Sequence, residues 1–155
     1  MRIQSFRIEN FRNLRLVECL NVPDFMVICG GNGCGKSALL EALMIAKESV
    51  GPYGNFNIDK RAISASSEQA IITMTLSFKD QEILLAKEIF GEIHNTEKVV
   101  VKINRKGGPN IQAPDPLKRL LGYYSTRNTD STSSLGFFEY INAYRQTQKT
   151  KIQEF

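Results

Sequence analysis

Hydrophobic and polar residues alternate at the start of the chain and again in its middle. The alternation over residues 2–8 predicts a β-strand with one face in solvent, and 15–19 is expected to return as a second strand. Further strands are predicted at 69–78, 82–90 and 97–104. The connections between these three are too short for helical crossovers, so we expect them to form an antiparallel sheet.

Two different patterns lie next to each other between these strand regions. Residues 25–29 are continuously apolar, which predicts a parallel strand covered on both faces. Residues 38–47 consist of strong helix formers and are apolar on most of the helix circumference, which predicts a helix lying against a sheet. The first fifty residues therefore indicate an α/β core.

The last third of the chain predicts a return to this core. We expect a short helix at 117–121, a core strand at 122–125 and a polar loop over 126–134. A stripe of aromatic and apolar residues at spacings of three and four then predicts a helix over 137–149. This stripe is more typical of core packing than of a base-stacking surface.

A glycine-rich segment joins the apolar run to the predicted helix. It fits the phosphate-loop pattern G-x-x-x-x-G-K-[ST] at every fixed position, because glycines let backbone N–H groups approach a polyphosphate closely. The residues expected to bind the nucleotide here are Gly30, Gly31, Asn32, Gly33, Cys34, Gly35, Lys36, Ser37 and Ala38. Lys36 is the catalytic candidate, expected to reach the β and γ phosphates, and the Ser37 hydroxyl is expected to coordinate Mg²⁺. A glycine turn without a ligand is the alternative, and the strand and helix on either side disfavour it.

Composition narrows the class of protein. With 155 residues, 42% of them hydrophobic and 23% charged, the chain is typical of one globular domain. We predict neither a membrane span nor a signal peptide, and therefore a cytoplasmic protein. The three cysteines and single histidine lack metal-site spacing. A net charge of +4 is compatible with nucleic-acid contact, although a solvated basic face is the simpler interpretation.

The segment from Ile3 to Leu14, read together with the glycine-rich loop, resembles the N-terminal half of an ABC-type ATPase head. The branch concerned contains the RecF, SMC and Rad50 proteins and the AAA family ATPases of the OLD nuclease type. The resemblance implies a P-loop NTPase fold with a mainly parallel core and an antiparallel β-subdomain. It also implies that ATP and Mg²⁺ are bound, and that Arg12 and Asn13 approach the nucleotide from the N-terminal turn.

The resemblance also implies how the chain is organised. Residues 1–155 would be the N-terminal lobe of the head, with the P-loop core at 1–50, the β-subdomain at about 69–104 and the return to the core at about 115–150. In the family a Gln-bearing loop follows the next core strand, and 124–128 contain no Gln; Gln146 and Gln148 are weak substitutes. No Walker B strand or signature segment is recognisable, so we expect a separate C-terminal half to supply them.

The resulting hypothesis is an ATP-binding lobe of an ATPase whose heads dimerise around nucleotide. Its expected partners are a second head, the C-terminal half, DNA and an effector nuclease, in DNA repair or phage defence. Alone, this chain is expected to bind ATP without efficient turnover, because it lacks the water-activating carboxylate. Two alternatives remain: a complete small P-loop kinase, and a nucleotide-dependent interaction module that never hydrolyses ATP.

Overall fold

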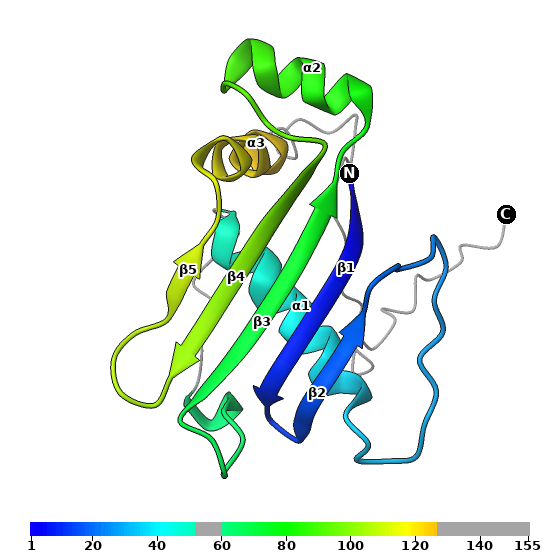
Figure 1. Cartoon of the computed structure of the whole chain (residues 1–155), viewed down its shortest axis with the longest axis vertical. Helices are drawn as coiled ribbons and strands as arrows, with labels where there is room; N and C mark the ends of the chain where they lie inside the picture. Colours follow the sequence, from blue (N-terminus) through cyan, green and yellow to red (C-terminus); the bar gives the residue numbers. More distant parts are fainter. Residues whose placement is uncertain (52–59, 127–155) are drawn as a thin grey trace, which may run out of the picture.

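One antiparallel sheet organises the part of the chain that the structure describes. The computed structural model describes residues 1–51 and 60–126. Its elements are β1 (Arg2–Phe11), β2 (Leu14–Cys19), α1 (Lys36–Val50), the short 3-10 helix η1 (Lys60–Ala62), β3 (Gln69–Ser77), α2 (Asp80–Ile89), β4 (Thr96–Asn104), β5 (Asn110–Gln112) and α3 (Asp115–Thr126). The strand order is β2-β1-β3-β4-β5, and all four pairings are antiparallel (Figure 1).

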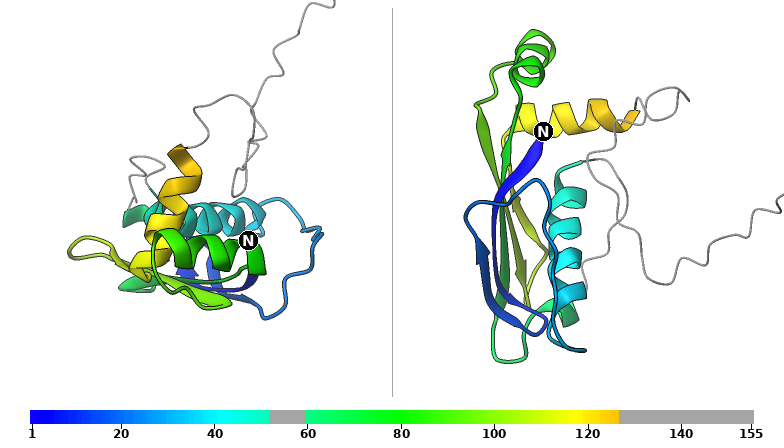
Figure 2. Two further views of the ribbon diagram at one scale, coloured as in Figure 1. Left: turned by 90° about the horizontal axis from the view of Figure 1, so that it is seen from above. Right: turned by 90° about the vertical axis from the view of Figure 1, so that its right-hand side faces the viewer.

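Helix α1 covers one face of this sheet, so the fold has two layers (Figure 2). Alternation along the strands directs every second side chain to the helix, and the register aligns these side chains across the sheet. Ile72 lies opposite Val101, and Met74 lies opposite Val99. All four are buried together with Ile45 of α1. The core therefore lies between the sheet and α1, as the helix-forming run at 38–47 predicted.

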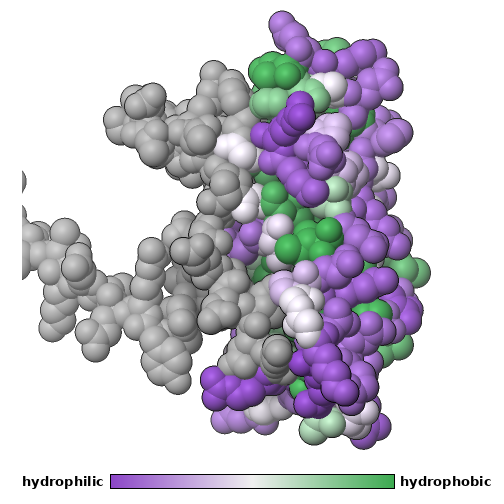
Figure 3. Space-filling model, turned by 90° about the vertical axis from the view of Figure 1, so that its left-hand side faces the viewer, coloured by the Kyte–Doolittle hydropathy of each residue, from purple (hydrophilic) through white to green (hydrophobic). Residues whose placement is uncertain are grey.

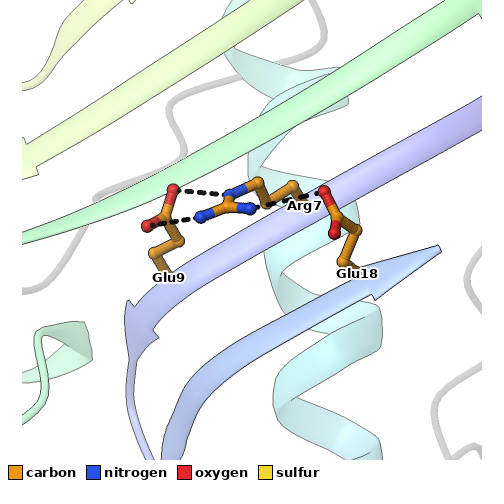
Figure 4. Close-up of polar contacts among 3 residues, drawn as sticks. All are labelled: Arg7, Glu9 and Glu18. Atoms are coloured by element: carbon orange, nitrogen blue, oxygen red, sulfur yellow. Dashed lines mark hydrogen bonds and ion pairs between the residues drawn. The ribbon is translucent and has the colours of Figure 1, made fainter. Parts of the chain in front are cut away.

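The other face of the sheet is polar. Arg7 of β1 lies between Glu9 on the same strand and Glu18 on β2, and α1 lies behind the sheet from these side chains (Figure 4). Seen from the side of β5, the described surface is also largely hydrophilic, with hydrophobic groups in scattered patches (Figure 3). No helix among residues 1–51 and 60–126 has the length and apolar character needed to cross a membrane.

The strand predicted at 82–90 is wrong, because this segment is helix α2. The Lys79 main-chain N–H donates to the Glu82 carboxylate over 2.8 Å, which satisfies one donor near the helix start. Asp80 and Glu82 also place negative charge at the positive end of the helix dipole. The β3–β4 ladder still runs from Gln69 and Asn104 to Ser77 and Thr96, so α2 is an insertion at the end of a hairpin.

The strand predicted at 25–29 is also wrong. No strand within residues 1–51 and 60–126 pairs with this segment, and Phe25 and Val27 are 82% and 66% exposed. An apolar run becomes a strand only when a neighbour satisfies its backbone groups and covers its side chains. The expected parallel core is therefore not formed among the described residues.

The remaining strand predictions have mixed outcomes. The predicted strands at 2–8, 15–19, 69–78 and 97–104 are confirmed as β1, β2, β3 and β4. The short β5 was not predicted, and β3 pairs directly with β1, so the strands of 69–104 share one sheet with the N-terminal hairpin.

At the end of the described chain, the short helix predicted at 117–121 is confirmed and is longer than expected. It extends as α3 through 122–125, where a core strand was predicted, so that strand is wrong. Leu117, Leu120 and Leu121 are buried at helical spacing, which anchors α3. Residue 126 is the last of α3; the rest of the predicted loop and the helix predicted at 137–149 lie outside the described residues.

Candidate nucleotide-binding site

The glycine-rich loop leads directly into the first turn of α1. Gly35 precedes the helix in a left-handed conformation, with φ of 105°, and Gly33 has φ of 78°. A Cβ at Gly35 would come 2.4 Å from Leu14 Cδ2, so any other residue here would require the Leu14 side chain to shift. The pattern therefore places glycine at Gly35 for two reasons, backbone conformation and lack of space.

Lys36 is the first residue of α1 and folds back over the loop. Its Nζ donates to the main-chain oxygens of Gly30 and Gly31 over 2.7 and 2.8 Å and lies 3.8 Å from Cys34 Sγ. The two oxygen partners are peptide carbonyls, and no carboxylate is among the contacts of this ammonium with the loop. Phosphate oxygens are stronger acceptors for an ammonium than peptide oxygens, because a charged acceptor shortens and strengthens the bond.

The N-terminus of α1 adds further donors beside Lys36. The N–H groups of the first turn have no partners within the helix, and the helix dipole is positive at this end. Ser37 is exposed there, whereas Ala38 is buried against the core. The Ser37 hydroxyl suits a Mg²⁺ ion, which favours oxygen ligands and keeps several waters. Among the described residues, no three His, Cys, Asp or Glu side chains gather into a metal site.

The turn between β1 and β2 touches both the loop and α1. The Asn13 side-chain amide donates to the Gly33 main-chain oxygen over 2.7 Å. An N–H of the Arg12 guanidinium donates to Glu41 Oε1 over 2.5 Å, and Glu41 lies on α1. The structure therefore brings Asn13 into direct contact with the loop, and it brings Arg12 into contact with α1.

Sequence reasoning missed three charged residues around this region. Glu41 could have been found from its position four residues after Ser37, which places both on one face of α1. Arg61 and Arg105 join Arg12 around a hollow of about 450 Å³, also lined by Ile63 and Ala65. These arginines come from segments far apart in sequence, so no local pattern connects them.

Two hydrogen-bond sets fix the position of the three-arginine hollow. The Arg105 guanidinium donates to the main-chain oxygens of Ser64, Ala65 and Ser67 over 2.7 to 3.1 Å. The Arg12 N–H donates to the Ala62 oxygen over 2.6 Å. The acceptors on Arg105 are main-chain oxygens and do not neutralise its positive charge, whereas Arg12 is paired with the Glu41 carboxylate. Arg105 therefore gives the hollow positive charge that favours an anion.

Comparison with protein families gives a match over nearly the whole chain. Residues 1–153 match the family described as "AAA ATPase domain". This extent includes the glycine-rich loop, the five-stranded sheet and the α-helices α1, α2 and α3 of the described residues.

Two curated relatives are DNA replication and repair proteins RecF. The protein from Haemophilus ducreyi is 46% identical over 43 residues, which are 28% of this chain and 12% of the relative. The protein from Shewanella sp. (strain W3-18-1) is 29% identical over 94 residues, or 59% of this chain and 26% of the relative. The matched part of this chain thus corresponds to about a quarter or less of these relatives.

Solved structures of SMC ATPase heads share the fold. An SMC head bound to the C-winged helix domain of ScpA aligns with a TM-score of 0.57 and 15% identity, over 87% of this chain and 42% of that one. A structure from work on ATP-driven dimerization and DNA-stimulated activation of SMC ATPases aligns with a TM-score of 0.56 and 16% identity, over 77% of this chain and 75% of that one. The predicted P-loop NTPase fold is thereby confirmed. The chain belongs to the AAA ATPase domain family, and its fold is shared with SMC ATPase heads.

Proposed function

We propose that this chain binds ATP together with Mg²⁺ through the loop from Gly30 to Ser37. The observation that carries the proposal is the convergence of three groups on one loop: the Lys36 ammonium, the N-terminus of α1 and the β1–β2 turn. On binding, Lys36 would exchange its two carbonyl partners for phosphate oxygens. Ser37 would hold the Mg²⁺, which neutralises phosphate charge during transfer to water.

We further propose that hydrolysis needs partners that complete the head. Phosphoryl transfer to water requires a carboxylate that positions the attacking water, and the sequence contains no recognisable Walker B strand to carry one. The apolar run at 25–29 supports a partner that supplies strands beside it, since the run is not part of a described strand and Phe25, Met26 and Val27 are exposed. A C-terminal half of the ATPase and a second head are the partners that fit this role.

DNA is the target that the charge distribution favours over an effector nuclease. Of the three arginines that line the three-arginine hollow, Arg12 is paired with Glu41 of α1, so we assign the DNA contact to Arg61 and Arg105. Arginine forks bind phosphate oxygens bidentately, so the hollow suits a nucleic-acid backbone. The relatives are named for DNA replication and repair, which agrees with this choice.

Calorimetric titration of ATP with Mg²⁺ tests nucleotide binding. The wild-type chain, Lys36→Ala and Lys118→Ala would be compared, followed by phosphate release on the same samples. Lys118 is an exposed lysine paired with Asp115 on α3, so it controls for the loss of a surface charge. Binding by wild type and Lys118→Ala that disappears in Lys36→Ala, without turnover, is expected. Equal binding by all three chains would contradict the proposed site.

A further inference from the structure

The Arg12–Glu41 ion pair links the β1–β2 turn to the first turns of α1. Glu41 lies four residues after Ser37, so the two share a face of the helix and are about 6 Å apart along its axis. The guanidinium that Glu41 holds is therefore placed about one helical turn behind the hydroxyl expected to bind Mg²⁺. Lys36 bonds to the loop at Gly30 and Gly31.

Backbone contacts with residues 62–64 hold the main chain around Arg12 in place. Its backbone is left-handed, with φ of 51°, and its N–H donates to the Ala62 oxygen over 2.6 Å. On either side, Phe11 forms a bridge with Ile63, and the Asn10 oxygen accepts from the Ser64 N–H over 2.8 Å. The position of the Arg12 Cα is thus fixed, and only the side-chain rotamer decides where the guanidinium lies.

Glu41 fixes the rotamer of the Arg12 side chain and occupies only part of its guanidinium. Arg12 is 51% exposed and its bond to Glu41 uses one terminal nitrogen, whereas a guanidinium has five N–H donors in a planar fork. The other donors can therefore face a ligand while the first stays on the carboxylate. An unpaired carboxylate one helical turn from a triphosphate would disfavour its binding, and the ion pair with Arg12 offsets that negative charge.

From this geometry we propose that Glu41 is a positioning residue that orients Arg12 toward the phosphates of the bound nucleotide. The inference rests on the proposed function, because it assigns a role within the same ATP site. Glu41 acts through Arg12 and does not itself contact the nucleotide.

A double-mutant cycle on ATP affinity tests this role. Calorimetry with ATP and Mg²⁺ would compare wild type, Arg12→Ala, Glu41→Ala and the double variant. Each single change is expected to weaken binding about 10-fold, the effect of losing one charged hydrogen bond. The double variant is expected to bind no more weakly than Arg12→Ala, because Glu41 acts only through Arg12.

Conservative variants separate positioning from a purely structural contact. Glu41→Gln keeps an acceptor oxygen and is expected to retain most of the affinity, which also covers the case in which Glu41→Ala does not fold. Arg12→Lys keeps the charge without the fork and is expected to bind ATP nearly as weakly as Arg12→Ala. Glu18→Ala, which breaks an ion pair with Arg7 on the far face of the sheet, should bind like wild type.

Three results would overturn the inference: additive losses in the double variant, unchanged affinity in Glu41→Ala, or tighter binding in Glu41→Ala. The last result would mean that Glu41 withholds Arg12 from the nucleotide. Lys36→Ala in the same series separates this failure from failure of the site itself. If wild type binds ATP in a Lys36-dependent manner, only the role of Glu41 is lost; if it does not, both proposals fall.

Discussion

The side-chain amide of Asn13 donates to the main-chain oxygen of Gly33 over 2.7 Å, which ties the N-terminal hairpin to the middle of the glycine-rich loop. Twenty residues separate the two in sequence. Gly33 has φ of 78°, in the left-handed region that favours glycine. The hydrogen bond from Asn13 holds the Gly33 carbonyl in the orientation that this backbone conformation gives it. The hairpin thereby becomes part of the candidate site.

Asn13→Ala removes this hydrogen bond and leaves the Gly33 oxygen to water. We expect ATP affinity to fall by about 5-fold, equivalent to the ~1 kcal/mol of one hydrogen bond, because the loop must be ordered at the cost of binding. Calorimetric titration with ATP and Mg²⁺ measures this loss of affinity. Asn21 is exposed, and Asn21→Ala serves as the control. Unchanged affinity in Asn13→Ala would show that the loop holds its shape without the hairpin.

Gly35→Ala tests the close approach of Leu14 to the loop. The left-handed backbone alone costs an alanine about 1–2 kcal/mol, and the 2.4 Å approach of Leu14 Cδ2 adds a clash. Gly107→Ala is the matched control, since Gly107 has a similar φ of 96° with open space around it. Urea unfolding should show a larger loss for Gly35→Ala than for Gly107→Ala. Equal losses would mean that Leu14 moves aside freely.

Ile45→Ala tests the packing of α1 against the sheet. Ile45 is buried in the core cluster, so its truncation should lower the free energy of unfolding by about 2–5 kcal/mol. Leu84→Ala on α2 removes a side chain that is 67% exposed and should change stability little. Chemical denaturation of both variants provides the measurement, and a small loss for Ile45→Ala would contradict this core.

Acid sensitivity is expected from the Arg7–Glu9 pair. The hydrogen bond from the Arg7 guanidinium lowers the pKa of Glu9 below its ordinary value of 4.5. A lowered pKa contributes stability above the unfolded-state value, and this contribution disappears as pH falls through the folded-state pKa. Glu9→Gln should therefore lose less stability than wild type below about pH 4.5, a small difference because the pair is solvent-exposed. Denaturation midpoints of wild type and Glu9→Gln, measured across that pH range, test this difference. If both midpoints fall equally with pH, the pair contributes nothing to stability.

Arg61→Gln tests the three-arginine hollow as a nucleic-acid contact. Affinity for DNA should fall alike for all sequences, and the dependence of affinity on salt should weaken by about one unit of slope if one phosphate contact is lost. Arg119→Gln, an exposed arginine on α3 outside the hollow, serves as the control. Equal effects of the two substitutions in fluorescence titrations would argue that only net charge matters.

Local sequence patterns determined much of this protein. The period-two alternation of β1, β3 and β4 specified strands with one buried face, and the glycine loop followed by helix formers specified α1 and its first residues. These signals depend on neighbours along the chain, so they could be recognised without the fold. The same signals located the candidate site from Gly30 to Ser37 and, through the resemblance, the turn at Arg12 and Asn13.

Tertiary structure decided the elements whose state depends on partners distant in sequence. The apolar run at 25–29 has strong strand character, but with no described strand beside it most of its side chains stay exposed. The segment at 82–90 had enough apolar residues for a strand and became α2, where acidic residues near its start and the bond from Lys79 to Glu82 favour a helix. The Arg12–Glu41 pair and the three-arginine hollow exist only because the fold brings separate segments together. Charged residues show no periodicity along the sequence that would identify their partners.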